Sequence, residues 1–342
     1  MTSPSVLRIS RAEVVEEATT ILELNGTPHH LAVEVAESLV GAQEVGHASH
    51  GLIRLLEYTK FVEKGQVIPH AEPAIVTDNG SAIVIDGNWG WGQIACKLAV
   101  DLAVERAAVH GVMGITIRSC NHIGRLGEYV ELLAEQKLVS LMWCNADPAV
   151  AAFGGTQRLL GTNPFASGIP TDQKPLVLDF ATSASAEGKI RVARANGQQV
   201  KPGQIIDKDG KPSTNPNDFY DGGALLPFGE HKGYGMSLMI ELLGGALSGN
   251  HPSINDNYVV GNGAVLLVIN PAKFIPYGEF LDDVVQASNR IRQSPPSDPA
   301  FPVMMPGDLE NSIKAKNGGM VVVDEPIWAS INSLKAELQS SH

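Results

Sequence analysis

The fold class is decided by residues 112–144, VMGITIRSCNHIGRLGEYVELLAEQKLVSLMWC. This stretch opens with an apolar run at Val112–Ile117 and closes with another at Val139–Cys144. A polar loop and an amphipathic helix lie between the two runs, and strands that alternate with helices are typical of an α/β sheet. The same order precedes the stretch, because we predict a short buried strand at Ala82–Ile85 and a long alanine-rich helix at Gln93–His110.

The sheet is predicted to be mixed, because the alternation of strands and helices stops after Asn145. Phe165–Pro170 and Leu176–Phe180 are strand-like and are joined by a turn too short for a parallel crossover, so they should pair antiparallel. Farther along we expect a long polar surface loop at Gln198–Gly223, a buried glycine-containing helix at Lys232–Gly249 and a strand at Gly263–Ile269. We then expect an amphipathic helix at Tyr277–Arg292, an extended segment at Ser294–Pro306, a strand at Met320–Val323 and a last helix from Pro326.

The first part of the chain is predicted to be helical. Ser10 and Glu13 have the spacing of a capping box, and Thr27 before Pro28 has the pattern of a second helix start with Thr as the cap. A third helix should begin after Ser49. We therefore expect a helical domain at residues 1–72 and a mixed-sheet domain at residues 73–293. Residues 294–342 should form an extended segment and a C-terminal helix that packs back on the helical domain.

The composition excludes several classes of function. The chain has 342 residues, 44% of them hydrophobic, so it can bury a large core. Its net charge of −12 argues against nucleic-acid binding, which needs a basic face. No apolar run is long enough to span a bilayer, and residues 1–11 show no secretory signal. The three widely spaced cysteines argue against a disulfide framework, and we expect a cytoplasmic protein without a membrane partner.

The first candidate site lies in Gly-His-Ala-Ser-His-Gly-Leu-Ile-Arg, residues 46–54. Ser49 is a good helix cap, and His50 and Arg54 are four residues apart, on one face of the predicted helix. An acid/base at a helix start, with a cation one turn later, could handle a small anionic substrate. The structural alternative is that Ser49 caps, His50 packs and Arg54 is solvated. Spacing alone leaves both interpretations open.

Three other glycine-flanked loops could hold a ligand, and each has a structural alternative. His122 follows a predicted strand, where it could contact a ligand or bond only to backbone. Thr162 and Asn163 lie in a tight turn, where they could donate to a ligand or stabilise the turn. His231 and Lys232 begin a predicted helix, which is either an ordinary glycine-rich helix entry or a pyrophosphate cradle built from free N–H groups.

Asp179 is a carboxylate in an otherwise apolar strand, so it needs hydrogen-bond partners from a ribose or from nearby backbone. The common signatures are absent: the sequence has no G-x-G-x-x-G at a βα turn, no Walker loop, no G-x-S-x-G elbow and no C-x-x-C. His47 and His50 are three residues apart but lack an HExxH motif or an acidic partner motif. A metal site is therefore the less favoured interpretation of these histidines.

Taken in order, the loops resemble one protein family. The motifs are G-H-x-S-H-G-x-x-R, S-x-N-H-x-G, L-G-T-N-P, L-D-x-A-T-S, H-K-G-Y-G and a late P-G-[ED], between residues 46 and 308. This succession is similar to that of the malate/L-lactate dehydrogenase family that lacks a Rossmann fold. Its relatives include ureidoglycolate and sulfolactate dehydrogenases, 2,3-diketogulonate reductase and Δ1-piperideine-2-carboxylate reductase. The resemblance covers nearly the whole chain.

The resemblance implies an α/β fold in which a non-Rossmann mixed-sheet domain, residues 73–293, binds the nucleotide and a separate helical domain accompanies it. It also implies a homodimer that uses NAD or NADP on a small anionic carboxylic acid. The implied reaction interconverts a 2-oxo acid and a 2-hydroxy acid. The alternative is NADPH-dependent reduction of a cyclic 2-imino acid, such as Δ1-piperideine-2-carboxylate or Δ1-pyrroline-2-carboxylate, or of a diketo-sugar acid.

Site roles also follow from the resemblance. His50 is implied to be the proton donor and acceptor, Ser49 its neighbour, Arg54 the clamp for the substrate carboxylate, and His122 a residue beside nicotinamide and substrate. The substrate side is expected to include Thr162 and Asn163. The other implied cofactor positions are Gly124, Leu176, Val177, Leu178, Asp179, Phe180, Ala181, Thr182, His231, Lys232, Gly233, Pro306, Gly307 and Asp308.

These residue types suit the implied chemistry. Hydride transfer belongs to the nicotinamide, an imidazole can move one proton near neutral pH, and a guanidinium can hold a carboxylate through two parallel hydrogen bonds. Ile123 and Glu230 depart from the pattern, where Phe and Gly are common. Two other classes remain: a metal-dependent lyase or hydrolase that uses His47, His50 and His122, and a ligand-binding subunit without turnover.

Overall fold

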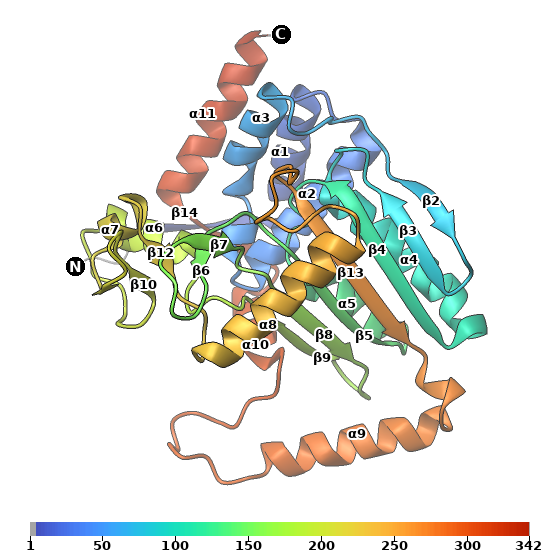
Figure 1. The fold of residues 1–342 in the computed structure, drawn as a ribbon. Helices are drawn as coiled ribbons and strands as arrows, with labels where there is room; N and C mark the ends of the chain where they lie inside the picture. Colours follow the sequence, from blue (N-terminus) through green and yellow to red (C-terminus); the bar gives the residue numbers. More distant parts are fainter. Residues whose placement is uncertain (1–4, 342) are drawn as a thin grey trace.

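The computed structural model describes residues 5–341, and its centre is a seven-stranded sheet of strand order β2-β3-β4-β13-β5-β8-β9 (Figure 1). Its strands are β2 (Ala74–Asp78), β3 (Ala82–Asp86), β4 (Val112–Cys120), β5 (Val139–Cys144), β8 (Phe165–Ile169), β9 (Leu176–Phe180) and β13 (Asn262–Ile269). In this sheet β3 and β4 pair parallel, and the other neighbours pair antiparallel. The predicted mixed sheet is confirmed, and so is the antiparallel pairing of β8 with β9.

Helices α4 and α5 cover one face of this sheet. The helices are α1 (Arg11–Leu24), α2 (His29–Glu44), α3 (Arg54–Glu63), α4 (Gly92–His110), α5 (Leu126–Glu135), α6 (Glu187–Ala195), α7 (Pro216–Tyr220), α8 (His231–Glu241), α9 (Tyr277–Arg292), α10 (Asp308–Asn317) and α11 (Glu325–Ser341). Alternate residues of β5, such as Met142 and Cys144, are buried beneath α4 and α5. Helix α5 lies so close to β8 that a Cβ on Gly168 would come 2.2 Å from the carbonyl oxygen of Val130.

Helix α8 and its π-helical continuation η2 (Leu242–Leu247) lie in front of the strands in Figure 1. Close packing at the glycines is confirmed, because a Cβ on Gly244 would come 2.6 Å from the backbone nitrogen of Asn145. The prediction of one buried helix over 232–249 is wrong in two respects. The hydrogen bonding changes from α to π at Leu242, and the outer side chains are exposed, Leu247 by 60%.

The helical region gathers around α1, which contacts α2, α3 and α11. Helices α1, α2 and α3 share an apolar cluster with α11 and with a two-stranded sheet of β1 (Val6–Ser10) and β14 (Met320–Asp324) (Figure 1). Ser10 caps α1 as predicted, its hydroxyl accepting from the N–H of Glu13. Thr27 is not the cap of α2, which is Pro28; its hydroxyl accepts from the indole N–H of Trp91 instead. The strands β1 and β2 were not predicted.

A five-stranded sheet of order β11-β10-β12-β6-β7 forms a second, smaller core with α6 and α7. Its strands are β6 (Val150–Ala151), β7 (Arg158–Leu160), β10 (Ile205–Ile206), β11 (Pro212–Ser213) and β12 (Ala224–Leu225). The prediction of a surface loop with little core at 198–223 is therefore wrong. Ile205 and Phe219 are buried there, because these isolated apolar residues meet partners from α6 and, from farther away in the sequence, from residues 150–160.

The segment after β13 leaves the body of the molecule. A 3₁₀ turn, η3 (Pro271–Lys273), leads into α9, which lies apart from the sheets in Figure 1. Ser288 is the one buried residue of α9, and residues 294–306 contain no helix or strand, as predicted. None of the helices in residues 5–341 has the length and apolar character that crossing a membrane requires.

Candidate active site

A cavity of about 470 Å³ gathers side chains from three parts of the chain. The helical region supplies one wall, the loops that follow β4 and β5 form the floor, and the small sheet with α6 and α7 supplies the other wall. The predicted residues that line the cavity are Ser49, His50, Arg54, His122, Gly124 and Thr162. Residues separated by more than 100 positions therefore meet where the motif series predicted one site.

Ser49 and His50 lie in a 3₁₀ turn, η1 (Ala48–His50), that precedes α3. The N-cap of α3 is Ile53, so the prediction that Ser49 caps this helix is wrong. The Ser49 hydroxyl oxygen lies 3.1 Å from Nδ1 of His50 instead. A hydroxyl on Nδ1 orients the imidazole and leaves Nε2 as the ring nitrogen for other partners.

His122 stacks on His50 across the cavity floor. Their ring centroids are 5.3 Å apart, and the ring planes are inclined by 24°. Nδ1 of His122 lies 2.8 Å from the Tyr58 hydroxyl and accepts from the N–H of Gly124 at 3.3 Å. His122 is therefore held by groups from both the helical region and its own loop.

Both histidines are poised to be neutral at neutral pH. Burial, followed by the positive charge of Arg54, lowers the pKa of His50 to about 3. Burial, followed by Arg54 and His50, also lowers the pKa of His122 well below its usual range. A buried neutral imidazole can accept a proton or a hydrogen bond from a bound substrate.

Arg54 is fixed at the cavity edge. Its Nε donates to the carbonyl oxygen of Ser49 at 2.7 Å, and its Nη1 donates to Glu57 at 2.6 Å. Its side chain is 22% exposed, so the alternative of a solvated arginine is wrong. Within residues 5–341 no hydrogen bond uses Nη2, which leaves part of the guanidinium fork for an anion in the cavity.

The opposite wall is joined to α3 by a chain of charges that the sequence did not reveal. Arg191 of α6 contacts Glu57 at 3.1 Å and Glu187 at 2.6 Å. The Tyr220 hydroxyl donates to Glu187 at 2.6 Å. A charged amphipathic helix such as α6 looks like a solvated surface helix in the sequence, and no short-range spacing connects it to residue 57.

The turn at residues 162–163 has a mainly supporting role. Asn163 is fully buried, and its amide donates to Glu241 at 2.8 Å while its oxygen accepts from the N–H of Ala146. Asn163 does not line the cavity that contains His50, and its part in substrate binding stays a prediction. Thr182 is likewise buried and donates to the carbonyl oxygens of residues 162 and 163.

Two of the predicted cofactor segments lie together at the edge strand β9. The N–H of Val177 donates to the carbonyl oxygen of Pro306 at 3.2 Å, and the left-handed Gly307 passes this strand closely. Asp179 accepts from the N–H of Gly127 at 2.8 Å. Burial raises the pKa of this carboxyl, and the Gly127 hydrogen bond opposes the rise. Asp179 thus has the local backbone partner that one interpretation of the sequence required.

His231 and Lys232 begin α8, as predicted, and both are exposed. The helix has no side-chain cap, and Glu230 before it takes the left-handed φ of 56°. Gly233 is required at its position, because a Cβ there would come 1.9 Å from the carbonyl oxygen of Phe228. These residues do not line the cavity that contains His50.

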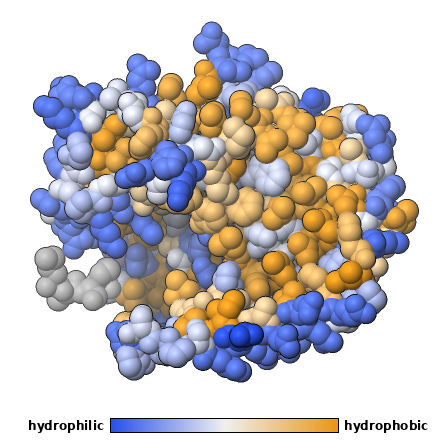
Figure 2. Space-filling model, turned by 60° about the horizontal axis from the view of Figure 1, so that its bottom comes forward, coloured by the Kyte–Doolittle hydropathy of each residue, from blue (hydrophilic) through white to orange (hydrophobic). Residues whose placement is uncertain are grey.

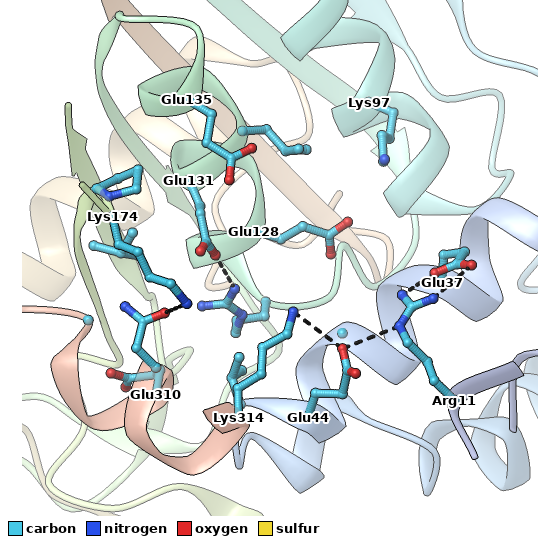
Figure 3. Close-up of a pocket in the computed structure, with 18 residues that line it drawn as sticks. Arg11, Glu37, Glu44, Lys97, Glu128, Glu131, Glu135, Lys174, Glu310 and Lys314 are labelled. Carbon is cyan, nitrogen blue, oxygen red and sulfur yellow. Dashed lines mark hydrogen bonds and ion pairs between the residues drawn. The ribbon is translucent and has the colours of Figure 1, made fainter. Parts of the chain in front are cut away.

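A second cavity, of about 370 Å³, lies between α2, α5 and α10 (Figure 3). Val177 and Gly307 are part of its lining. Figure 3 shows acidic and basic side chains that face one another here, with Lys314 and Arg11 both reaching toward Glu44. These mixed charges connect the helical region with the sheet beside the predicted cofactor positions.

The described residues contain no group of three or more His, Cys, Asp or Glu side chains arranged to hold a metal. His47 does not join the His50–His122 pair, since its Nε2 faces Glu310 at 3.4 Å. The three histidines of the metal hypothesis are thus divided between two surroundings.

The sequence analysis also missed Tyr58 and Gln93, which support His122. Gln93 Nε2 donates to the Tyr58 hydroxyl at 2.7 Å, and both residues are buried. One signal for Tyr58 was available, because it follows Arg54 by four residues and so lies on the same face of α3. Gln93 had no such signal, since it comes from the start of α4.

The chain matches known proteins along nearly its whole length. The model of the malate/L-lactate dehydrogenase family matches residues 9–332. The L-lactate dehydrogenase of Cupriavidus necator is 34% identical over 342 residues, which cover 97% of this chain and 98% of the relative. The L-sulfolactate dehydrogenase of Methanocaldococcus jannaschii is 34% identical over 323 residues, 93% of each protein.

Solved structures show the same similarity. The sulfolactate dehydrogenase from Methanocaldococcus jannaschii superposes with a TM-score of 0.88 at 31% identity, over 97% of this chain and 98% of that one. The Δ1-piperideine-2-carboxylate reductase from Pseudomonas syringae pvar. tomato has a TM-score of 0.86 at 30% identity, over 96% and 99%. The likeness therefore extends over both the sheets and the helical region.

Proposed function

Because the chain belongs to the malate/L-lactate dehydrogenase family, we propose that this oxidoreductase interconverts a small 2-hydroxy acid and its 2-oxo acid with NAD or NADP. The observation that carries the proposal is the meeting of Ser49, His50, Arg54 and His122 in one cavity. An imidazole for the proton and a guanidinium for the carboxylate are the two groups that this reaction asks of the protein.

His50 is the proposed acid/base. Its burial favours the neutral ring, which can take the hydroxyl proton of a bound 2-hydroxy acid. Ser49, at Nδ1, keeps the ring oriented during this transfer. In the reverse direction the imidazolium must form, and a substrate carboxylate beside Arg54 would favour it by offsetting the arginine's charge.

Arg54 is the proposed clamp for the substrate carboxylate. The bonds from its Nε and Nη1 to Ser49 and Glu57 fix the plane of the guanidinium before substrate arrives. A preset plane lowers the entropy lost on binding and selects which face of the substrate carbon is presented. Thr162, on the cavity wall, is the proposed additional substrate contact.

The cofactor is proposed to lie along the sheet, held without a Rossmann fold. Bound nicotinamide would supply the hydride chemistry. His122 and Gly124 are the proposed contacts at the first cavity, and Val177 with Gly307 those at the second. The other proposed cofactor positions on β9, α8 and α10 are Leu176, Leu178, Asp179, Phe180, Ala181, Thr182, His231, Lys232, Gly233, Pro306 and Asp308.

We further propose the three-part organisation, a helical domain (1–72), a cofactor-binding sheet domain (73–293) and a C-terminal part (294–342), in a cytoplasmic homodimer. In this division the helical domain brings the acid/base and the clamp, and the sheet domain holds the cofactor. Contacts of α11 with α1 and α3 support the return of the C-terminal part to the helical domain. The apolar side chains exposed on α8 and η2 support a subunit interface there.

A second candidate reaction is NADPH-dependent reduction of a cyclic 2-imino acid. It is favoured by the similarity to the Δ1-piperideine-2-carboxylate reductase, at 30% identity. The same two groups suit this substrate, since it also carries a carboxylate next to the carbon that accepts hydride. The imine nitrogen would then take the place of the carbonyl oxygen beside His50.

A spectrophotometric screen tests the proposal. Loss of reduced-nicotinamide absorbance is followed with NADH and with NADPH against pyruvate, oxaloacetate, sulfopyruvate, a diketo-sugar acid and Δ1-piperideine-2-carboxylate. We expect turnover of one oxo acid, and a fall of about 100-fold or more in kcat for His50→Asn. Near wild-type turnover in His50→Asn would exclude His50 as the acid/base, and turnover of the imine alone would select the second reaction.

A further inference from the structure

A buried chain of three side chains ends on His122. Gln93, 1% exposed, donates from Nε2 to the Tyr58 hydroxyl at 2.7 Å. Tyr58, 2% exposed, has its hydroxyl 2.8 Å from Nδ1 of His122. Neither Gln93 nor Tyr58 lines the cavity, so both can reach a bound substrate only through His122.

The direction of this chain is set by the backbone of the loop. The N–H of Gly124 points to Nδ1 of His122 at 3.3 Å, and an amide N–H can only donate. Nδ1 must therefore offer a lone pair, which requires the neutral tautomer with its proton on Nε2. The Tyr58 hydroxyl then donates to the same nitrogen.

The orientation of the Gln93 amide sets the direction of the remaining hydrogen bond, the one between Gln93 and Tyr58. If its amide were turned so that the oxygen met Tyr58, the tyrosine hydrogen would point to Gln93, and two lone pairs would face each other over the 2.8 Å to Nδ1. The orientation with Nε2 donating removes this conflict. In this orientation the Gln93 oxygen is buried and has no hydrogen-bond partner in residues 5–341. An unsatisfied buried acceptor lowers the stability of the fold.

We infer that Gln93 and Tyr58 are positioning residues that hold His122 in the Nε2–H tautomer, so that His122 donates a hydrogen bond to the reacting oxygen or nitrogen and does not accept its proton. The catalytic part of this inference rests on the proposed function. Within residues 5–341, Nε2 of His122 has no partner of its own and is left for a ligand. In this scheme His50 transfers the proton, and His122 polarises the substrate's carbon–oxygen or carbon–nitrogen bond.

The tautomer can be measured without any turnover. Protein labelled with ¹⁵N-histidine, at neutral pH, is examined by long-range ¹H–¹⁵N correlation, and the His122 signals are assigned by their loss in His122→Gln. We expect a protonated Nε2 and a hydrogen-bonded, unprotonated Nδ1 in the wild type. A protonated Nδ1 in the wild type would overturn the inference, whether or not the protein is a dehydrogenase.

Two variants test whether Tyr58 and Gln93 set the tautomer of His122. Tyr58→Phe and Gln93→Met should each shift His122 toward a mixture of tautomers and lower kcat about tenfold with little change in KM, a smaller loss than removal of the whole donor. Thr59→Val is the matched control, because Thr59 is buried on the same helix but bonds to Asn25 and Leu55. It should leave both readouts unchanged.

The outcomes separate the two proposals. An unchanged tautomer in both variants overturns the positioning role of Gln93 and Tyr58, and Gln93→Met decides the question if Tyr58→Phe is too unstable to study. A shifted tautomer with unchanged kcat overturns the catalytic role of His122 as a donor and leaves the proposed oxidoreductase reaction intact. Absence of turnover with every oxo and imino acid overturns the proposed function, while the spectra still decide the tautomer.

Discussion

The surroundings of His50 and His122 determine what these residues can do. Each ring is half-buried and stacks on the other, and burial, followed by the positive charge of Arg54, lowers the pKa of both rings and so favours the neutral form. The unfolded chain has no such surroundings, so its histidines bind protons near pH 6.5. The surroundings that keep these histidines neutral therefore lower the stability of the fold in acid.

Acid should therefore destabilise the fold through His50. Its folded-state pKa, about 3, lies below the unfolded value, so between these values the unfolded chain binds more protons and the free energy of unfolding falls as pH falls. We expect His50→Asn to reduce the slope of that free energy by about 1.4 kcal/mol per pH unit between about pH 6 and pH 4. Urea unfolding at several pH values measures the slope.

The exposed His70 provides the control. His70→Asn should leave the slope of the wild type unchanged. A slope that is the same in His50→Asn and in the wild type would contradict the picture of a buried neutral ring.

Arg54→Leu should separate substrate binding from cofactor binding. Loss of a bidentate ion pair is expected to raise KM for the acid substrate about 100-fold. KM for the nicotinamide should change little, and kcat should fall as well because Ser49 loses the bond to Arg54. Steady-state kinetics with both substrates varied provide the measurement, and an unchanged KM for the acid would refute the clamp.

At the residue scale, sequence reasoning found candidates but not their partners. Histidine and arginine at a helix start or strand end are chemically distinctive, which made His50, Arg54 and His122 candidates. Spacing left a structural interpretation open for each of them, and the family resemblance supplied their predicted roles. Ser49 was misread as a helix cap, and the sequence left two roles open for Asn163, because a polar residue in a turn looks the same whether it meets a ligand or, like Asn163, a buried Glu241. Only burial and distance, which depend on the whole fold, distinguish the two cases.

At the element scale, glycines show where helices and strands approach one another. Gly168 of β8 faces the backbone of α5, whereas Gly114 of β4 has no atom within 4 Å of where a Cβ would lie. Both glycines are in strands of the same sheet. They form a matched pair with opposite expectations.

Gly168→Ala should destabilise the protein by about 3 kcal/mol, because the methyl group would lie 2.2 Å from the carbonyl oxygen of Val130 and backbone must move. Gly114→Ala should change stability by less than about 1 kcal/mol, and in the stabilising direction, since alanine has less freedom to lose on folding. Chemical denaturation of both variants measures the difference. Equal effects would mean that α5 does not set the position of β8.

Elements were predicted best where the pattern is local. The strands and helices of 82–144 follow from their own apolar periodicity, and the β8–β9 pairing follows from its short turn. The small sheet was missed because its strands are only two or three residues long. Strands of that length have no periodicity and gain stability only from partners elsewhere in the chain.

At the scale of the whole molecule, one face exposes apolar side chains that are not part of the core. Figure 2 shows a face on which apolar side chains form a broad area with polar side chains along its border. The exposed apolar side chains of α8 and η2 are Met239, Leu242, Leu243 and Leu247. An exposed apolar area of this kind on a folded protein usually marks an interface.

The proposed homodimer gives this face a partner, and charge placed on it should separate the subunits. Leu243 and Leu247, which are 39% and 60% exposed, have room for a carboxylate in the monomer, so Leu243→Asp/Leu247→Asp should fold and yet lower the mass in solution from two chains to one. Size-exclusion chromatography with light scattering measures the mass. Val109→Asp is the control, because Val109 is 75% exposed on α4, a helix of the opposite layer, and should leave the dimer intact. A monomeric wild type, or a double variant that stays dimeric, would place the interface elsewhere and leave the apolar face of α8 and η2 without its proposed partner.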